Sequence, residues 1–181
     1  MKFSASIQHS KSTFYRLADV QYSTFCIGLI LMWVACACIC LFVAIANSQN
    51  VLLFCIFMFS ACWLFTAIKM PAKRKAEKLA NLCKENFPST EYFFEENGIF
   101  IKSADDTISL EYEQVFAFLE DAEYYYLFLN RYSGYMVSKA SISPPECKEF
   151  RKFVVEKIGK HCMRPTSIFN LNIRRLRMHL K

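Results

Sequence analysis

The sequence predicts an α+β membrane protein, made of a two-helix transmembrane hairpin and a small antiparallel β domain closed by a carboxy-terminal helix. Two long runs without any Asp, Glu, Lys or Arg lie at residues 24–46 and 51–68. Short alternating segments separated by turn residues fill residues 91–138. The 181 residues leave room for one modest domain beside the hairpin, and this length excludes a large enzyme.

The first 23 residues predict a strand followed by a short helix. Phe3, Ala5 and Ile7 alternate with polar neighbours, which is the period of a half-buried strand. Such a strand needs a sheet to join. Ser12 is expected to cap a short helix that runs on into the first apolar run.

The two apolar runs have the lengths of membrane spans. As helices they measure about 34 Å and about 27 Å, against a hydrocarbon core of about 30 Å. A buried hairpin in a soluble core is the alternative, and uncharged runs of this length disfavour it. A cleaved signal peptide is also disfavoured, because the apolar core of a signal peptide has about 7–15 residues and is shorter than the first run. Residues 47–50 are polar and turn the chain, so the two helices are antiparallel.

Positive charge flanks the two runs on one side only. Lys2, Lys11 and Arg16 precede the first run, and the connection at residues 47–50 has no charge. The positive-inside rule therefore places both termini in the cytoplasm. Five cations after the second run are expected to contact the membrane surface, although they could also act only in setting topology. They are Lys69, Lys73, Arg74, Lys75 and Lys78.

A juxtamembrane basic helix is expected within residues 71–90, at residues 72–87, and Pro88 stops it. The β domain covers residues 91–160. Asn97-Gly98 predicts a tight hairpin in which both turn residues have positive φ, and Asp105-Asp106 predicts another turn. The expected strands are 91–95, 99–103, 107–112, 114–120, 124–129 and 135–138.

Two carboxy-terminal segments complete the chain. Ser143 and Glu146 have capping-box spacing with proline between them, so a helix is expected at residues 144–158 and ends at Gly159. Residues 161–181 form a basic tail with apolar anchors, which predicts an amphipathic segment lying on the membrane. Disorder of this tail remains an open alternative, and nucleic-acid binding is not expected. Its candidate membrane contacts are Arg174, Arg175 and Arg177.

The sequence contains no recognisable catalytic, metal or cofactor motif. Its four glycines cannot form a phosphate-binding loop, and its three histidines lack metal-ligand spacing. Six of the nine cysteines fall inside the apolar runs, where small packing residues are commoner than ligands. The tyrosines at residues 124–126 are expected to pack in a core rather than to stack on a ligand. We therefore expect no enzyme and no cofactor.

Two segments of the β domain carry a family resemblance. Residues 92–99 (YFFEENGI) and 108–115 (ISLEYEQV) follow two apolar runs and precede a run of tyrosines and a terminal helix. This pattern resembles the YcxB-like family of bacterial membrane proteins, over residues 1 to about 159. The resemblance implies a domain similar to bacterial pleckstrin-homology folds, a bent antiparallel sheet closed by the carboxy-terminal helix, and no established activity. The expected location is the cell inner (cytoplasmic) membrane.

Two functional hypotheses follow. In the first, the β domain binds a protein partner or a lipid head group at the inner leaflet, through the turn and edge that contain Asn130, Arg131, Tyr132 and Tyr135. In the second, the chain is a structural or regulatory subunit of a larger membrane complex, or a homo-oligomer, and acts through its transmembrane helices. Small residues permit close helix approach there. They are Ala35, Ala37, Ala44, Ala46, Ser60 and Ala61.

Overall fold

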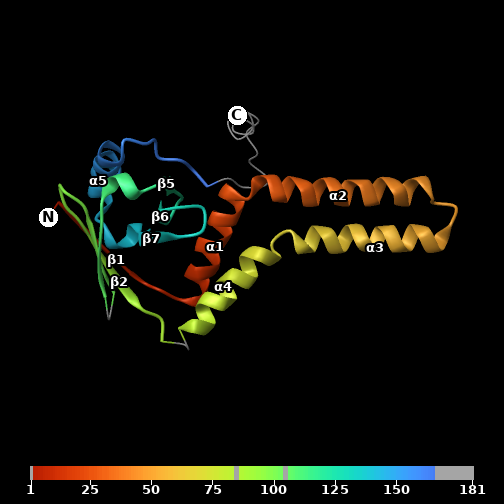
Figure 1. Ribbon diagram of the computed structural model, residues 1–181, viewed down its shortest axis with the longest axis horizontal. Coiled ribbons are helices and arrows are strands. Elements are labelled where there is room, and N and C mark those ends of the chain that lie inside the picture. Colours follow the sequence, from red (N-terminus) through yellow and green to blue (C-terminus); the bar gives the residue numbers. More distant parts are fainter. Residues whose placement is uncertain (1, 84–85, 104–105, 166–181) are drawn as a thin grey trace.

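The computed structural model describes residues 2–83, 86–103 and 106–165. These residues form an α+β structure with five α-helices and two antiparallel sheets, which confirms the predicted class. Figure 1 shows an elongated molecule in which α2 (Ile27–Ala46) and α3 (Val51–Ala67) project from a globular part. The helices α1 (Lys11–Phe25) and α4 (Met70–Leu82) lie between the two parts.

The seven strands divide into a four-stranded and a three-stranded sheet. The first has the order β1-β2-β3-β4, so the amino-terminal strand pairs with β2 and joins the sheet. The second has the order β5-β6-β7. The strands are β1 (Phe3–Gln8), β2 (Ser89–Phe94), β3 (Ile99–Ser103), β4 (Thr107–Leu110), β5 (Ala117–Glu120), β6 (Tyr124–Phe128) and β7 (Gly134–Ser138).

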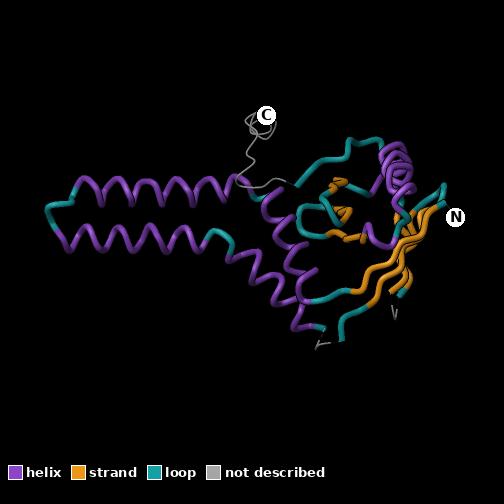
Figure 2. Tube along the Cα trace, turned by 180° about the vertical axis from the view of Figure 1, so that it is seen from behind, coloured by secondary structure: helices purple, strands orange, loops and turns teal. Residues whose placement is uncertain are grey.

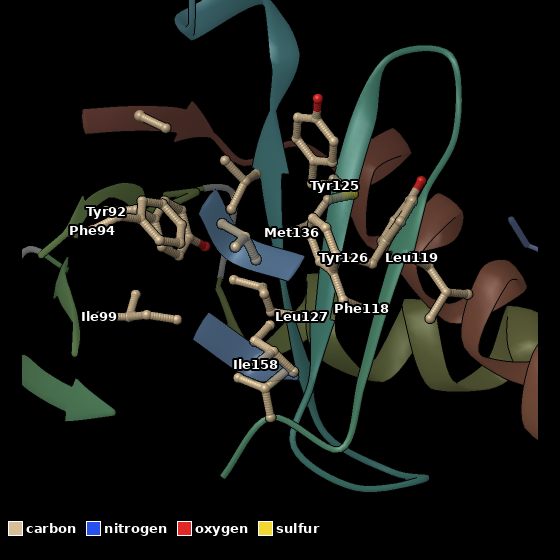
Figure 3. Close-up of a cluster of buried hydrophobic side chains, with 14 of the residues drawn as sticks. Tyr92, Phe94, Ile99, Phe118, Leu119, Tyr125, Tyr126, Leu127, Met136 and Ile158 are labelled. Carbon is tan, nitrogen blue, oxygen red and sulfur yellow. The ribbon is translucent and has the colours of Figure 1, made fainter. Parts of the chain in front are cut away.

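The core lies between the two sheets and α5 (Pro144–Ile158). Phe150 of α5 is fully buried, and its ring centroid lies 4.7 Å from that of Phe94 and 5.1 Å from that of Tyr125. One side chain of the helix therefore contacts both sheets. Figure 3 shows this core, with Tyr92 and Phe94 on one side and Phe118 on the other. We call the two sheets and α5 together the β domain.

The helix before the first apolar run differs from the expectation in both its start and its end. It begins after Ser10 rather than Ser12, because the Ser10 side chain accepts from the Thr13 amide and Thr13 Oγ1 accepts from the Ser10 amide. It also breaks at Cys26 instead of running into the span. Phe25 packs on the β domain, with its ring 5.0 Å from that of Phe128. The expected segment 24–46 is therefore shortened to Ile27–Ala46.

The helix after the second apolar run is shorter than the expected 72–87. It ends at Leu82, several residues before Pro88. The ring of Phe87 lies 6.0 Å from that of Phe14 in α1, and the Phe87 carbonyl accepts from the Gln8 side chain. These contacts direct the chain into the sheet before proline could stop a helix.

The β2–β3 hairpin is present, but the predicted turn type was wrong. Phe94 pairs with Ile99, so the connection has four residues, closed by a hydrogen bond from the Glu95 amide to the Gly98 carbonyl. Gly159 alone among the described glycines has positive φ. A Cβ at Gly98 would lie 2.9 Å from the Leu110 carbonyl oxygen, so glycine is needed there for the close approach of the hairpin connection to the end of β4. Asp105, in the next expected turn, lies outside the described residues.

The expected strands 107–112 and 114–120 both lose residues to a 3₁₀ turn at Tyr112–Gln114. Tyr112 donates its hydroxyl hydrogen to the Glu95 carbonyl at 2.7 Å, and this draws the segment over the β2–β3 hairpin. At α5 the predicted bounds agree with the structure, but Ser143 makes no side-chain cap. Pro145, at the second helical position, has no N–H to donate, which removes one of the two usual partners for such a cap.

The helices α2 and α3 lie antiparallel and side by side (Figures 1 and 2). By length and composition, α2 is the one described helix that can cross a bilayer by itself. The shorter α3 reaches such a length only together with α4, across a bend of 43°. The expectation of two separate spans is therefore met in part, by one span-like helix and its antiparallel neighbour.

Candidate functional site

The helices α1 and α4 pack against each other through small residues and connect the hairpin to the β domain. Ala72 and Ala76 of α4 are buried against Ala18 of α1. Tyr15 of α1 donates its hydroxyl hydrogen to the Glu77 carboxylate across the pair at 3.1 Å. Alanine at one position per turn lets the two backbones approach closely, so the pair forms a firm connection.

The predicted cations of this region are not equivalent. Lys69, Lys73, Arg74 and Lys78 are exposed, and Lys69 lies 3.3 Å from Asp19 of α1. Lys75 is half-buried and points towards the β domain. Its ammonium group donates to the Gln21 side chain and, at 2.7 Å, to the carbonyl of Tyr132. Burial lowers the pKa of Lys75, and the neighbouring Cys26 offsets this only in part.

The contact of Lys75 with Tyr132 joins the predicted membrane-surface cations to the predicted binding turn. Gln21 of α1, which is buried, donates its side-chain N–H to the Arg131 carbonyl at 2.7 Å. Lys75 and Gln21 therefore bind consecutive carbonyls of the β6–β7 loop, residues 130–133. The loop is attached to both helices that lead into the hairpin.

The β6–β7 loop presents exposed side chains from an ordered backbone. Asn130 Oδ1 accepts from the amides of Tyr132 and Ser133 at 2.7 Å and 2.8 Å, which fixes the turn. The Tyr132 ring is 79% exposed, and the Arg131 side chain is exposed as well. The backbone is held by α1 and α4, so the ring and the guanidinium extend from a fixed position.

Tyr135, the fourth residue of the predicted edge, does not belong to this exposed group. It is half-buried, and its ring lies 6.4 Å from that of Tyr92 in the four-stranded sheet. β7 packs beside β1, so the expected free edge at residues 135–138 is covered by the amino-terminal strand. The two strands belong to different sheets, so this contact limits access to the edge without pairing its backbone groups.

An ionic network that the sequence did not predict also fastens α1 to the β domain. Arg16 Nε lies 3.2 Å from Asp121 Oδ2, and the same oxygen accepts the Tyr126 hydroxyl hydrogen at 2.6 Å. Burial by itself would raise the pKa of Asp121. The hydrogen bonds from Tyr126 and from two backbone amides, together with the charge of Arg16, outweigh burial and hold this pKa below its ordinary value.

Two sequence signals could have pointed to these contacts. Arg16 and Gln21 are long polar residues shortly before an apolar run, on a helix that also carries apolar residues on more than one face. A helix of that kind packs between two parts of a protein more readily than it stays exposed to solvent. The distant partners, Asp121 and Tyr132, have no local signal.

The small residues of the hairpin divide into two groups. Ala37, Ala44 and Ala61 are fully buried where α2 meets α3, whereas Ala35 and Ala46 are exposed. Ser60 donates its hydroxyl hydrogen to the Ile56 carbonyl of its own helix. Three of the six small residues predicted to permit close helix approach are therefore buried between α2 and α3 of the same chain.

The other predicted site residues lie in the carboxy-terminal tail, most of which the structure does not describe. Arg174, Arg175 and Arg177 lie outside the described residues, as does most of the expected tail at residues 161–181. Within residues 2–83, 86–103 and 106–165, no group of three or more His, Cys, Asp or Glu side chains could hold a metal ion. The described cysteines are all free thiols.

Comparison with known proteins finds one family. Residues 94–154 match the model of the family described as YcxB-like protein. No curated protein and no solved structure matches the chain. The matched segment begins in β2 and ends in α5, and it contains the whole β6–β7 loop. The segment that carries the exposed Arg131 and Tyr132 therefore lies within the part of the chain that is similar to this family.

Proposed function

We propose that this chain is a small membrane-anchored binding protein, in which α2 and α3 cross the bilayer and hold the β domain at the cytoplasmic leaflet. The observation that carries the proposal is the attachment of the β6–β7 loop to both helices that lead into the hairpin. Lys75 and Gln21 bind the loop carbonyls directly. The loop would thus remain close to the membrane surface and present Arg131 and Tyr132 there.

The exposed surface of the hairpin supports its placement in lipid. Phe42, Ile45 and Phe59 are 73%, 68% and 75% exposed, and no other described element covers them (Figure 1). Contiguous apolar surface of this kind is rare on soluble monomers. Hydrocarbon is the environment that would cover it without a further partner. The cations on α4 and at the amino terminus would then lie on the cytoplasmic side.

The comparison with pleckstrin-homology folds is part of the proposal. It is supported by seven antiparallel strands in two sheets followed by one carboxy-terminal helix. Such a domain would bind a protein or a lipid head group without catalysing a reaction. The β6–β7 loop is the candidate contact surface.

Single-cysteine labelling tests the topology. In the full chain with its own cysteines replaced by alanine, Ser48→Cys lies in the hairpin connection and Lys148→Cys lies on the exposed face of α5. An impermeant maleimide applied to intact bacteria should label Ser48→Cys, and should label Lys148→Cys only after lysis. Labelling of Lys148→Cys from outside would contradict the proposed orientation.

Photo-crosslinking tests the contact surface. A photoreactive amino acid at position 132 should capture a protein or lipid in the membrane, and the same group at position 148 on α5 should capture much less. The Tyr132 ring is largely exposed, so its replacement leaves the fold intact. Equal capture at both positions would remove the β6–β7 loop as the binding surface.

The second candidate is a subunit of a larger membrane complex that acts through its helices. The exposed Ala35 and Ala46 favour it, because small residues on an outer helix face allow a further helix to approach. Photo-crosslinking from position 35 distinguishes the two functions. Capture of a protein there, with none at position 132, would support the subunit function.

A further inference from the structure

A cavity lies where α1 meets α2, beside the first strand of the three-stranded sheet. Its volume is about 520 Å³, within the range of about 300–1,000 Å³ that ligand pockets commonly have. Arg131 of the β6–β7 loop supplies its charged side chain. Much of the rest of the lining is apolar, including Phe25, Ile27, Leu31, Phe116 and Met163.

The cavity is continuous with the exposed apolar surface of α2. Phe116 and Leu29, both in the lining, are 47% and 43% exposed. If α2 enters the bilayer at Ile27, its 20 residues span about 30 Å, which is the thickness of the hydrocarbon core. The cavity then lies at the level where acyl chains end and head groups begin.

Two features of the cavity favour an anion. The Arg131 side chain is exposed and makes no ion pair with any described residue, since only its carbonyl is engaged, by Gln21. The start of α2 has no side-chain cap, and its first internal donors are Leu29 and Ile30, which both bond to the Cys26 carbonyl. The amides of Ile27 and Gly28 therefore belong to the unpaired, partly positive end of the helix.

We propose that this cavity binds one anionic phospholipid from the surrounding leaflet. Its phosphate lies on Arg131 and the start of α2, and one acyl chain lies along Ile27, Leu31 and Phe116. The assignment rests on the proposed function, because it requires α2 in the bilayer and the β domain on the cytoplasmic side.

The charge of the chain favours a lipid over the carboxy-terminal segment as the occupant. Residues 166–181, which follow the described part, contain Arg174, Arg175 and Arg177 and no acidic residue. A segment with this charge is repelled by Arg131, whereas a phosphate is attracted.

Fluorescence quenching by brominated lipids tests the assignment on the full chain. Phe116→Trp, in a chain with Trp33→Phe and Trp63→Phe, places the one reporter in the cavity lining. The protein is reconstituted in phosphatidylcholine nanodiscs that contain a small share of brominated phosphatidylglycerol or, in parallel, brominated phosphatidylcholine. Apparent binding of the anionic lipid should be about fivefold stronger than that of the neutral one.

Matched variants separate charge from shape. Arg131→Gln should abolish the preference for phosphatidylglycerol, Arg131→Lys should retain most of it, and Lys148→Gln on α5 should leave it unchanged. Gly28→Leu should lower quenching by both lipids. A Cβ at Gly28 meets no atom within 4 Å, so the larger side chain fits into the open space without backbone strain.

Equal quenching by the two lipids, or a preference that survives Arg131→Gln, would overturn the assignment. It would also be overturned if neither lipid quenched the reporter until the chain was shortened to end at Pro165, because the carboxy-terminal segment would then be the occupant. The parent chain serves as the reference for the proposed function. If its Trp33 and Trp63 are quenched while the Phe116→Trp reporter is not, the hairpin is in lipid and only the cavity assignment fails.

Discussion

The hairpin and the β domain bury opposite kinds of side chain. In the β domain Phe94, Phe118 and Phe150 are fully buried, as expected for a core in water. In the hairpin the fully buried residues are the three alanines between α2 and α3, while Phe42 and Phe59 face outwards. The same residue type is therefore inside one part and outside the other. The difference is the one expected if the two parts fold in different solvents.

Truncation of phenylalanine should have opposite consequences in the two parts. Phe150→Ala removes a fully buried ring that contacts both sheets, so we expect a loss of about 3–5 kcal/mol in the free energy of unfolding of the β domain. Phe42→Ala makes the same chemical change on the exposed face of α2 and should leave this free energy unchanged. Denaturant unfolding of the full chain in detergent, followed by near-ultraviolet circular dichroism, measures both. Similar losses in the two variants would remove the distinction.

A charge on the outer face of the hairpin tests its solvent directly. Ile39 is 62% exposed in the middle of α2, and Ile39→Arg should cost about 2.5–3.5 kcal/mol of membrane insertion. The variant should therefore be released from membranes by alkaline carbonate to a greater extent than the parent chain. Ile108→Arg is the matched control, because Ile108 is exposed on β4, outside the hairpin. If the two variants are retained alike, the outer face of α2 is not in hydrocarbon.

Enlarging an alanine should separate the two faces of α2. Ala37 is fully buried against α3, so Ala37→Leu overfills that contact and should destabilise the hairpin by about 1–3 kcal/mol. Ala35→Leu adds the same atoms on an exposed face and should be neutral. Thermal unfolding in detergent, followed by helical circular dichroism, compares them. A large effect at position 35 instead would point to a partner helix there.

The smallest expected effect concerns the contact between α1 and the β domain. Asp121 is ionised at neutral pH and binds Arg16 and Tyr126, and its pKa in the folded protein lies below the ordinary value of 3.8. Its contribution to stability is therefore present above about pH 4 and is lost as the pH falls through the lower folded pKa. Asp121→Asn should cost about 1 kcal/mol at neutral pH.

The variant should also show a weaker loss of stability on acidification than the parent. Glu96, whose pKa is lowered to about 2 by hydrogen bonds from Lys157 and Lys2, titrates at low pH in both proteins, so the difference between the two curves isolates Asp121. Unfolding curves between neutral and acid pH supply this comparison. Parallel curves would mean that Asp121 does not couple α1 to the β domain.

Local patterns predicted the strands and the last helix well. Alternation located the amino-terminal strand and the strand that begins at Thr107, turn residues separated the other strands, and proline and glycine located both ends of α5. Those signals act within a few residues of the element that they define. The break at Cys26 was missed because its cause, the contact of Phe25 with Phe128, joins residues far apart in the sequence. The direction of Lys75 was missed for the same reason.

The sequence by itself determined the α+β class, the order of the elements and the two uncharged runs, because these depend on composition and on spacing along the chain. Only the tertiary structure decided that α1 leaves the axis of α2, that Lys75 binds the β6–β7 loop and that a cavity forms beside Arg131. Each of these depends on contacts between distant segments, and their energies arise only when the two sheets, α1 and α4 have come together.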